Sequence, residues 1–216
     1  MEKREGVGYT GGMTKQRFLV LLFAVAAGLV LAGILAHAQK SHMAASGDLI
    51  PVTKDAFGGP FTLTDHTGKK VTDKDFTGKY RLIYFGFTYC PAICPTELAK
   101  ITAALKILGE AGKDIQPIFI TVDPERDTAE AMGKYVAMFH PSLVGLTGTP
   151  EQIKKVAKDY KIYFAQVQDE SMSDYTMDHS SFIYFMAPDD RLLRIFRMED
   201  SAQDMAGIIR RWMQAQ

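Results

Sequence analysis

The sequence of 216 residues has few cysteines and no excess charge of either sign. Its two cysteines, Cys90 and Cys94, are too few for a disulfide-rich scaffold and too close together for a long-range structural disulfide. The 25 basic and 25 acidic side chains balance, which excludes a strongly basic nucleic-acid-binding protein. With 47% hydrophobic residues and no repeat or low-complexity segment, the composition is that of a globular protein.

Charged and strongly polar side chains are also missing from one long stretch, Phe18 to Leu35. At about 1.5 Å per helical residue, this stretch nearly spans a bilayer core about 30 Å thick. Lys15 and Arg17 precede it, and a basic flank stays on the cytoplasmic side while the rest of the chain crosses. We therefore predict a short cytoplasmic N-terminus at residues 1–17 and one transmembrane helix at residues 18–38.

The sequence leaves open whether this segment is kept or removed. Ala36-His37-Ala38 has the small-x-small pattern of a signal-peptide cleavage site after Ala38, but the apolar run exceeds the usual length of about 7–15 residues and so favours an anchor. Glu2 and Glu5 argue against a mitochondrial transit peptide, because such peptides contain few acidic residues. We predict a single-pass protein of a bacterial inner membrane, in preference to the mitochondrial inner membrane, with its C-terminal domain in the periplasm.

The rest of the chain is predicted to be a tether and one domain. Residues 39–50 begin with small and polar side chains without periodicity, whereas residues 51–216 have the size and apolar content of a single domain. The alternation of Phe61 to Thr64, the turn that follows and the apolar Val71 predict an N-terminal β-hairpin.

Strands and helices alternate along this domain. The further predicted strands cover residues 81–87, 115–122, 162–167, 181–186 and 191–197. The predicted helices cover residues 95–108 and 127–140, and two more begin near residues 149 and 202. This order is typical of a thioredoxin-like α/β fold with an N-terminal β-hairpin and a central helical insertion, here preceded by one transmembrane helix.

The two cysteines lie in Tyr89-Cys90-Pro91-Ala92-Ile93-Cys94-Pro95, directly after the first buried strand. A spacing of four residues is about one helical turn, so both sulfur atoms can face one point if a helix begins within the motif. A helix N-terminus also stabilises a thiolate. Two such thiolates can exchange a disulfide or hold a soft metal such as Cu(I), and the remaining alternative is an inert buried pair.

A metal site needs at least one further ligand, and the histidines are the candidates. Four of them are interpreted as solvated or capping residues: His37, His42, His66 and His140. His179 differs, because it ends a polar loop just before an apolar strand. In a thioredoxin-like fold that strand lies beside the strand leading to the cysteines, so we predict that His179 completes a Cys, Cys, His site.

Three stretches of the sequence, in this order, carry a family resemblance: FGFTYCPAICPTEL, TVDPERDT and DYTMDHSSFIYFM. Over about residues 50–213 the chain resembles the Sco/SenC family, the copper-binding assembly factors of cytochrome c oxidase. The resemblance implies that Cys90, Cys94 and His179 bind copper and that the fold is thioredoxin-like. It further implies delivery of copper to the CuA centre of oxidase subunit II, or reduction of the cysteines of that centre, with other copper chaperones or thioredoxin-like reductants as further partners.

The residues themselves agree with this ligand set and suggest its surroundings. Two thiolates and one imidazole suit three-coordinate Cu(I), and Cu(II) when a water or carboxylate is added. Asp178 and Asp123 are candidates to orient the imidazole or to lie near the metal, although each is equally well explained as a turn or loop residue. Met172 and Met177 are interpreted as loop or gap-filling residues rather than sulfur ligands.

Other functions of the same residues remain open at this point. A general thiol-disulfide oxidoreductase has two residues between its cysteines and a proline before the adjacent strand, whereas this chain has three residues and His179-Ser180-Ser181. A peroxiredoxin needs Thr-x-x-Cys, but Thr88 precedes Cys90 by only two positions. Whether the protein is an enzyme with Cys90 and Cys94 as its redox pair, a metallochaperone or an anchored interaction domain is decided by copper binding.

Overall fold

The structure is a computed structural model of the whole chain, and it describes residues 28–29, 57–168 and 174–215. The chain divides into two compact units, Met1–Gly47 and Asp48–Gln216, and every element named below belongs to the second. The predicted anchor at residues 18–38, apart from Gly28 and Leu29, and the tether at residues 39–50 lie outside the described residues. Within the described ranges, no helix has the length and hydropathy needed to cross a membrane.

Seven strands form one mixed sheet with the spatial order β2-β1-β5-β4-β3-β8-β9. These strands are β1 (Thr62–Asp65), β2 (Lys70–Thr72), β3 (Tyr80–Gly86), β4 (Ile115–Thr121), β5 (Val144–Thr147), β8 (Ile183–Met186) and β9 (Leu192–Phe196). β3, β4 and β5 are parallel, whereas β8 pairs antiparallel with β3 and β9 antiparallel with β8. β1 and β2 form an antiparallel N-terminal hairpin, and the short β5 has no counterpart among the predicted strands.

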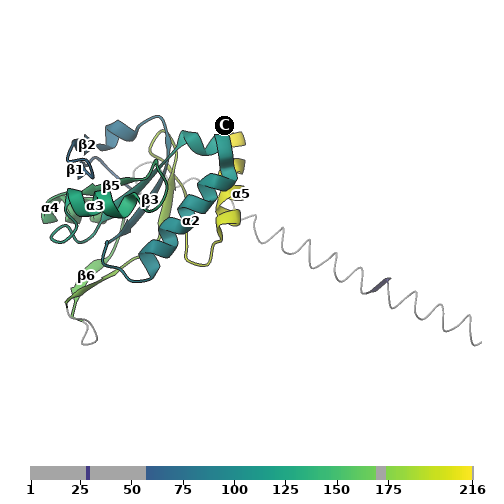
Figure 1. Cartoon of the computed structure of the whole chain (residues 1–216). Helices are drawn as coiled ribbons and strands as arrows, with labels where there is room; N and C mark the ends of the chain where they lie inside the picture. Colours follow the sequence, from purple (N-terminus) through teal and green to yellow (C-terminus); the bar gives the residue numbers. More distant parts are fainter. Residues whose placement is uncertain (1–27, 30–56, 169–173, 216) are drawn as a thin grey trace, which may run out of the picture. The chain divides into compact units, whose positions relative to one another are not determined.

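The described part of this unit also contains four α-helices and two short 3-10 helices. The α-helices are α2 (Ile93–Leu108), α3 (Ala129–Val136), α4 (Pro150–Asp159) and α5 (Ala202–Gln214), and the 3-10 helices are η1 (Asp73–Phe76) and η2 (Gly109–Asp114). Side chains cap three of the α-helices: Thr128 caps α3, Thr149 caps α4 and Ser201 caps α5. The sequence predicts the cap of α4 at Thr149, but it places the cap of α3 one residue early, at Asp127. α2 and α5 pack against each other and lie side by side (Figure 1).

The centre of the sheet is β3, and all seven of its residues are buried. A strand covered on both faces needs an almost continuous apolar sequence, which is why Tyr80 to Gly86 shows no alternation. One face carries Tyr84, whose ring stacks on Phe119 of β4 and lies below α2. The opposite face carries Phe85, which packs against Tyr160 at the end of α4.

A separate two-stranded ribbon extends from this sheet. β6 (Phe164–Val167) and β7 (Thr176–His179) pair antiparallel, with Phe164 opposite His179 and Val167 opposite Thr176. Figure 1 shows β6 reaching away from the main sheet. β7 was not predicted from the sequence, because the stretch around it is polar and only four residues long.

Candidate metal centre

The two cysteines are placed by the step from β3 into α2. The chain leaves β3 at Gly86, and the Cys90 amide donates to the carbonyl of Phe87 (3.3 Å) in the turn that follows. Cys94 is the second residue of α2 and is fully buried, whereas Cys90 lies before the helix and is half-buried. Pro95 fits the first helical turn, where its missing N–H removes no intrahelical hydrogen bond.

The two sulfur atoms have opposite electrostatic environments. The Cys94 amide donates to the Cys90 sulfur (3.4 Å). Hydrogen bonds from the Cys94 thiol, His179 and backbone amides lower the pKa of Cys90 to about 3 despite its partial burial. The neighbouring Cys90 thiolate and burial raise the pKa of Cys94. The reduced pair is therefore a Cys90 thiolate beside a protonated Cys94 thiol, as expected when one negative charge disfavours a second.

His179 reaches the cysteines from the end of the ribbon. Its Nε2 atom lies 3.5 Å from Cys94 Sγ, and its ring meets the rings of Phe87 and Tyr84 edge-on at centroid distances of 5.8 and 6.3 Å. Nδ1 faces the carbonyl oxygen of Ser180 at 3.1 Å. The prediction that His179 lies in a loop is wrong: it is the last residue of β7, where pairing with Phe164 fixes its backbone.

The separation between Cys94 and His179 also suits two ligands of one ion. With sulfur about 2.3 Å and nitrogen about 2.0 Å from a metal, as in zinc sites, a tetrahedral angle places the two atoms about 3.5 Å apart. In the part of the chain that the structure describes, no three His, Cys, Asp or Glu side chains already form a closed metal-binding set. Cys90, Cys94 and His179 instead hydrogen-bond one another, so binding a soft metal means replacing those shared protons by the ion.

A glycine makes room for the buried cysteine. A Cβ atom on Gly86 would lie 2.7 Å from Cys94 Sγ, closer than real Cβ atoms come, and a tight 3.0 Å from the Phe119 ring. Only glycine therefore allows the Cys94 thiol to pack directly on the end of β3. This role of Gly86 was not predicted from the sequence, although a glycine inside an apolar strand is a recognised signal of a close approach.

The TVDPERDT motif holds the cysteine loop through Asp127. This fully buried carboxylate accepts hydrogen bonds from the Thr88 amide (3.0 Å), the Thr88 hydroxyl (2.5 Å) and the Thr121 hydroxyl (2.6 Å). Burial raises the pKa of Asp127 although these three donors oppose the shift. Asp127 thus joins the turn before Cys90 to the end of β4, a role that the sequence analysis did not predict.

The same motif holds the ribbon through Asp123 and Arg126. Asp123 is buried and accepts from Arg126 Nε (2.5 Å) and from the Tyr175 hydroxyl (2.9 Å). The Arg126 guanidinium lies between two rings, 3.7 Å from the Tyr175 centroid and 4.7 Å from that of Tyr89, and Nη1 donates to the Tyr175 carbonyl (2.8 Å). We call Asp123, Arg126, Tyr175 and Tyr89 the arginine clamp, because they connect the residue before Cys90 to the strand that carries His179.

The two carboxylates predicted to lie near the metal, Asp123 and Asp178, have different surroundings in the structure. Asp123 contacts Arg126 and Tyr175 rather than His179, so its contact with the imidazole is indirect. Asp178 is exposed, and as the neighbour of His179 in a strand its side chain points to the opposite face of the ribbon. The group facing His179 Nδ1 is the Ser180 carbonyl.

The histidines and methionines that the sequence does not favour as ligands lie elsewhere in the domain or outside the described residues. His66 Nδ1 accepts from the Gly145 amide (3.2 Å), and His140 Nδ1 contacts the Ser142 hydroxyl (2.7 Å). Met177 packs partly buried against the core. Three residues fall outside the described ranges: His37, His42 and Met172.

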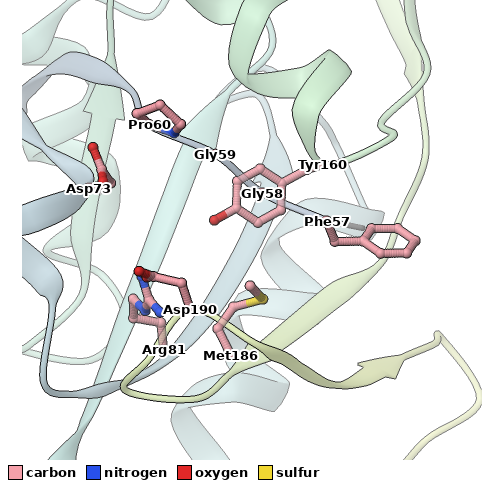
Figure 2. Close-up of a pocket in the computed structure, with 9 residues that line it drawn as sticks. All are labelled: Phe57, Gly58, Gly59, Pro60, Asp73, Arg81, Tyr160, Met186 and Asp190. Atoms are coloured by element: carbon pink, nitrogen blue, oxygen red, sulfur yellow. The ribbon is translucent and has the colours of Figure 1, made fainter. Parts of the chain in front are cut away.

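A cavity of about 300 Å³ lies at the opposite end of β3 and does not belong to the metal centre. Figure 2 shows the Arg81 and Asp190 side chains together on one side of it, with the Tyr160 ring opposite. Arg81 is buried and pairs with Asp190 (2.6 Å) and the Ala187 carbonyl (2.7 Å). No cysteine or histidine lines the cavity, so it offers no ligand for a soft metal.

Known proteins resemble this chain in sequence and in fold. The family model described as SCO1/SenC matches residues 51–214. Protein SCO1 homolog 1, mitochondrial, of Arabidopsis thaliana is 43% identical over 203 residues, a match that covers 90% of this chain but 60% of that protein. A crystal structure of Arabidopsis thaliana ScoI with copper bound is similar at 43% identity and a TM-score of 0.70, over 74% of this chain and 99% of the other. ScoI of Bradyrhizobium japonicum, also with copper bound, matches at 44% identity and a TM-score of 0.67, over 73% and 99%.

The relatives contradict the location predicted from the sequence, a bacterial inner membrane with the domain in the periplasm. Those from Arabidopsis thaliana, Danio rerio and Homo sapiens are all named as mitochondrial. The prediction was wrong because an apolar run with a basic flank indicates which way a segment crosses a membrane and not which membrane it crosses. The acidic residues Glu2 and Glu5 were given too much weight as evidence against mitochondria.

Proposed function

The chain belongs to the SCO1/SenC family, and from that premise we propose that it is a copper metallochaperone whose Cys90, Cys94 and His179 bind copper for cytochrome c oxidase assembly. Copper is the metal named in the structures of the Arabidopsis, Bradyrhizobium and yeast relatives. The observation that carries the proposal is the 3.5 Å separation of Cys94 Sγ and His179 Nε2. Beside them lies Cys90, whose pKa is lowered by its hydrogen bonds. Two sulfur donors and one imidazole favour a soft ion, and Cu(I) is the softest of the common candidates.

Copper is the cargo in this proposal, and the three ligands differ in how accessible they are. Cys94 is fully buried, whereas Cys90 and His179 are half-exposed. An incoming thiolate of a recipient therefore approaches copper from the Cys90 and His179 side and displaces those ligands first, while Cys94 holds the ion until last. We propose the apo CuA centre of oxidase subunit II as the recipient, because its cysteines supply such thiolates. Loading requires the reduced cysteine pair, since a disulfide has no thiolate to donate.

A second candidate function uses the same cysteines without copper. A low-pKa, half-exposed Cys90 beside a protonated Cys94 is the arrangement of a dithiol that attacks a disulfide and then closes its own. A structure of BsSco, 25% identical, is described as revealing a disulfide switch in a cytochrome c oxidase assembly protein. In this alternative the chain reduces the CuA cysteines of subunit II, and Cys90 and Cys94 end the reaction as a disulfide.

Copper stoichiometry separates the two functions. The full chain, reduced and then separated from reductant, is titrated with Cu(I) in competition with a chelator, beside Cys90→Ser, Cys94→Ser and His179→Ala. The metallochaperone predicts one copper per chain, loss with either cysteine variant, and weaker binding or changed geometry with His179→Ala. Asp178→Ala is the matched control, because its exposed side chain lies next to His179 but points away from the cysteines. Wild-type binding no stronger than the cysteine variants, together with rapid disulfide exchange, would establish the reductase instead.

We also propose that residues 18–38 anchor the domain in a membrane, with residues 1–17 on one side and a tether at residues 39–50 on the other. The apolar run from Phe18 to Leu35 supports this proposal. Extraction of the expressed full chain with alkaline carbonate tests it. The anchored protein stays in the membrane pellet, and replacement of Leu22 and Val25 by lysine releases it; recovery of the unaltered chain in the supernatant would contradict an anchor.

A further inference from the structure

A buried hydroxyl group lies directly beneath the proposed copper ligands. Tyr84 of β3 is fully buried, and its hydroxyl donates a hydrogen bond to Cys94 Sγ at 3.7 Å, a length that suits the large sulfur atom. The Tyr84 ring also meets the His179 ring edge-on at 6.3 Å. One side chain of the sheet therefore contacts both the most buried sulfur ligand and the imidazole ligand.

The position of Tyr84 does not need a hydroxyl for packing. All seven residues of β3 are buried, and the Tyr84 ring stacks on Phe119 as a phenylalanine would. A buried hydroxyl is unfavourable unless it has a partner, and here the partners are the Cys94 sulfur and the side chain of Ser181. Tyr135 packs on the same Phe119, yet its buried hydroxyl has no hydrogen-bond partner. The two tyrosine rings thus pack similarly, but only the Tyr84 hydroxyl forms a hydrogen bond.

We propose that Tyr84 is a positioning residue that sets the balance between Cu(I) and Cu(II) by donating a hydrogen bond to the Cys94 thiolate in the copper-loaded protein. This inference rests on the proposed copper-binding function. Tyr84 does not contact the metal; it acts through the sulfur. Hydrogen bonding around a cysteine sulfur is one of the ways in which proteins tune the redox potential of copper.

The direction of the effect follows from charge. A hydrogen bond withdraws electron density from the thiolate, which makes it a poorer donor to Cu(II), the form that gains more from a strong anionic donor. Removing the hydroxyl leaves the sulfur richer in electrons, so Cu(II) is favoured relative to Cu(I). The charge-transfer absorption from sulfur to Cu(II) moves to longer wavelength for the same reason, because an electron-rich sulfur is easier to oxidise.

The test compares the full wild-type chain with Tyr84→Phe and with Tyr135→Phe as the matched control. Cu(I) and Cu(II) affinities are measured by chelator competition, and the Cu(II) form is examined by visible absorption. For Tyr84→Phe we expect one copper per chain, an absorption band at longer wavelength, and a ratio of Cu(I) to Cu(II) affinity that falls about three- to tenfold, the net value of one hydrogen bond. Tyr135→Phe should match the wild type in both respects.

The possible failures are distinguishable. A wild-type chain that takes up no copper overturns the proposed function and this inference together. A wild-type chain that binds copper, with Tyr84→Phe identical to it in both affinity ratio and spectrum, overturns this inference alone. Equal shifts in Tyr84→Phe and Tyr135→Phe also overturn it, because they would show a general response to lost hydroxyl groups in this part of the core.

Discussion

The two halves of the candidate metal centre are held in place by different kinds of interaction. The cysteine half belongs to the core: Cys94 is fully buried at the start of α2, packed on Gly86 and Tyr84 of the central strand. The histidine half belongs to a two-stranded ribbon that is partly exposed and that joins the main body through the arginine clamp. Close packing therefore fixes the sulfur atoms, whereas a few polar and ring contacts fix the imidazole.

This difference suggests a division of labour. Core positions shift little because any displacement creates voids or clashes. A ribbon held by the arginine clamp opens at lower free energy than the core. Under the proposed function, His179 would then be the ligand that moves first when copper enters or leaves.

The largest expected difference is between the alkylation rates of the two cysteines. In the reduced, copper-free chain at pH 6, Cys90 is a half-exposed thiolate because its pKa is lowered to about 3, whereas Cys94 is buried and its pKa is raised. We expect iodoacetamide to modify Cys90 at least about a hundredfold faster than Cys94. Peptide mass spectrometry over time measures both rates. Similar rates would mean that Cys94 is not held by the core.

Arg126→Gln should loosen the histidine half alone. The substitution leaves the buried Asp123 carboxylate without its cation and removes both ring contacts. We therefore expect the free energy of unfolding to fall by about 2 to 4 kcal/mol. Hydrogen exchange should quicken at β7 and stay unchanged in α2. Equal acceleration in both would show that the ribbon and the core open together. Arg126→Lys should recover part of the loss, since a lysine restores the charge but not the planar stacking.

Gly86→Ala should disturb the cysteine half alone. The added Cβ would lie 2.7 Å from Cys94 Sγ, and we expect a loss of about 1 to 3 kcal/mol in urea unfolding together with faster alkylation of Cys94. Gly207→Ala is the matched control, because its Cβ would meet no atom closer than 3.9 Å within α5. This control should be stabilised by up to about 1 kcal/mol. A neutral Gly86→Ala would refute the close-packing account.

Arg191→Gln should have almost no effect and serves as the reference for Arg126→Gln. Arg191 pairs with Asp189 at 2.7 Å, and both side chains reach water, with 32% of Arg191 and 53% of Asp189 exposed. We expect the free energy of unfolding to change by less than about 0.5 kcal/mol and hydrogen exchange in β7 to stay unaltered. A loss comparable to that of Arg126→Gln would show that the ribbon responds to general surface charge rather than to the clamp.

The sequence predicted the cysteine half better than the histidine half. Hydrophobic pattern, capping residues and turn signals were enough for β3, α2 and the α/β layer order, because these depend on local periodicity and burial. β7 was not predicted because its four residues of mixed polarity show no hydrophobic periodicity. They form a strand only by pairing with β6. The role of His179 could be inferred, but its place in a strand could not.

The roles of Asp127 and Arg126, which hold the cysteine loop and the ribbon, could not be predicted for a different reason. Asp127 meets Thr88 across 39 positions of sequence, and Arg126 meets Tyr175 across 49. Such contacts follow from the three-dimensional arrangement and leave no local pattern. Asp123 and Asp178 were equally plausible from their neighbours in sequence, and only the structure distinguishes the buried, paired carboxylate from the exposed one.

The distance along the chain between Cys94 and His179, 85 positions, has a consequence for biosynthesis. During translation the cysteine pair emerges long before the ribbon that supplies the imidazole, and before the Asp127 carboxylate that fixes its loop. A nascent or truncated chain therefore presents an unprotected dithiol, open to oxidation, and cannot form the three-ligand site. Under the proposed function, copper capture through all three residues would be a property of the finished domain alone, and loading itself would serve as a check that folding is complete.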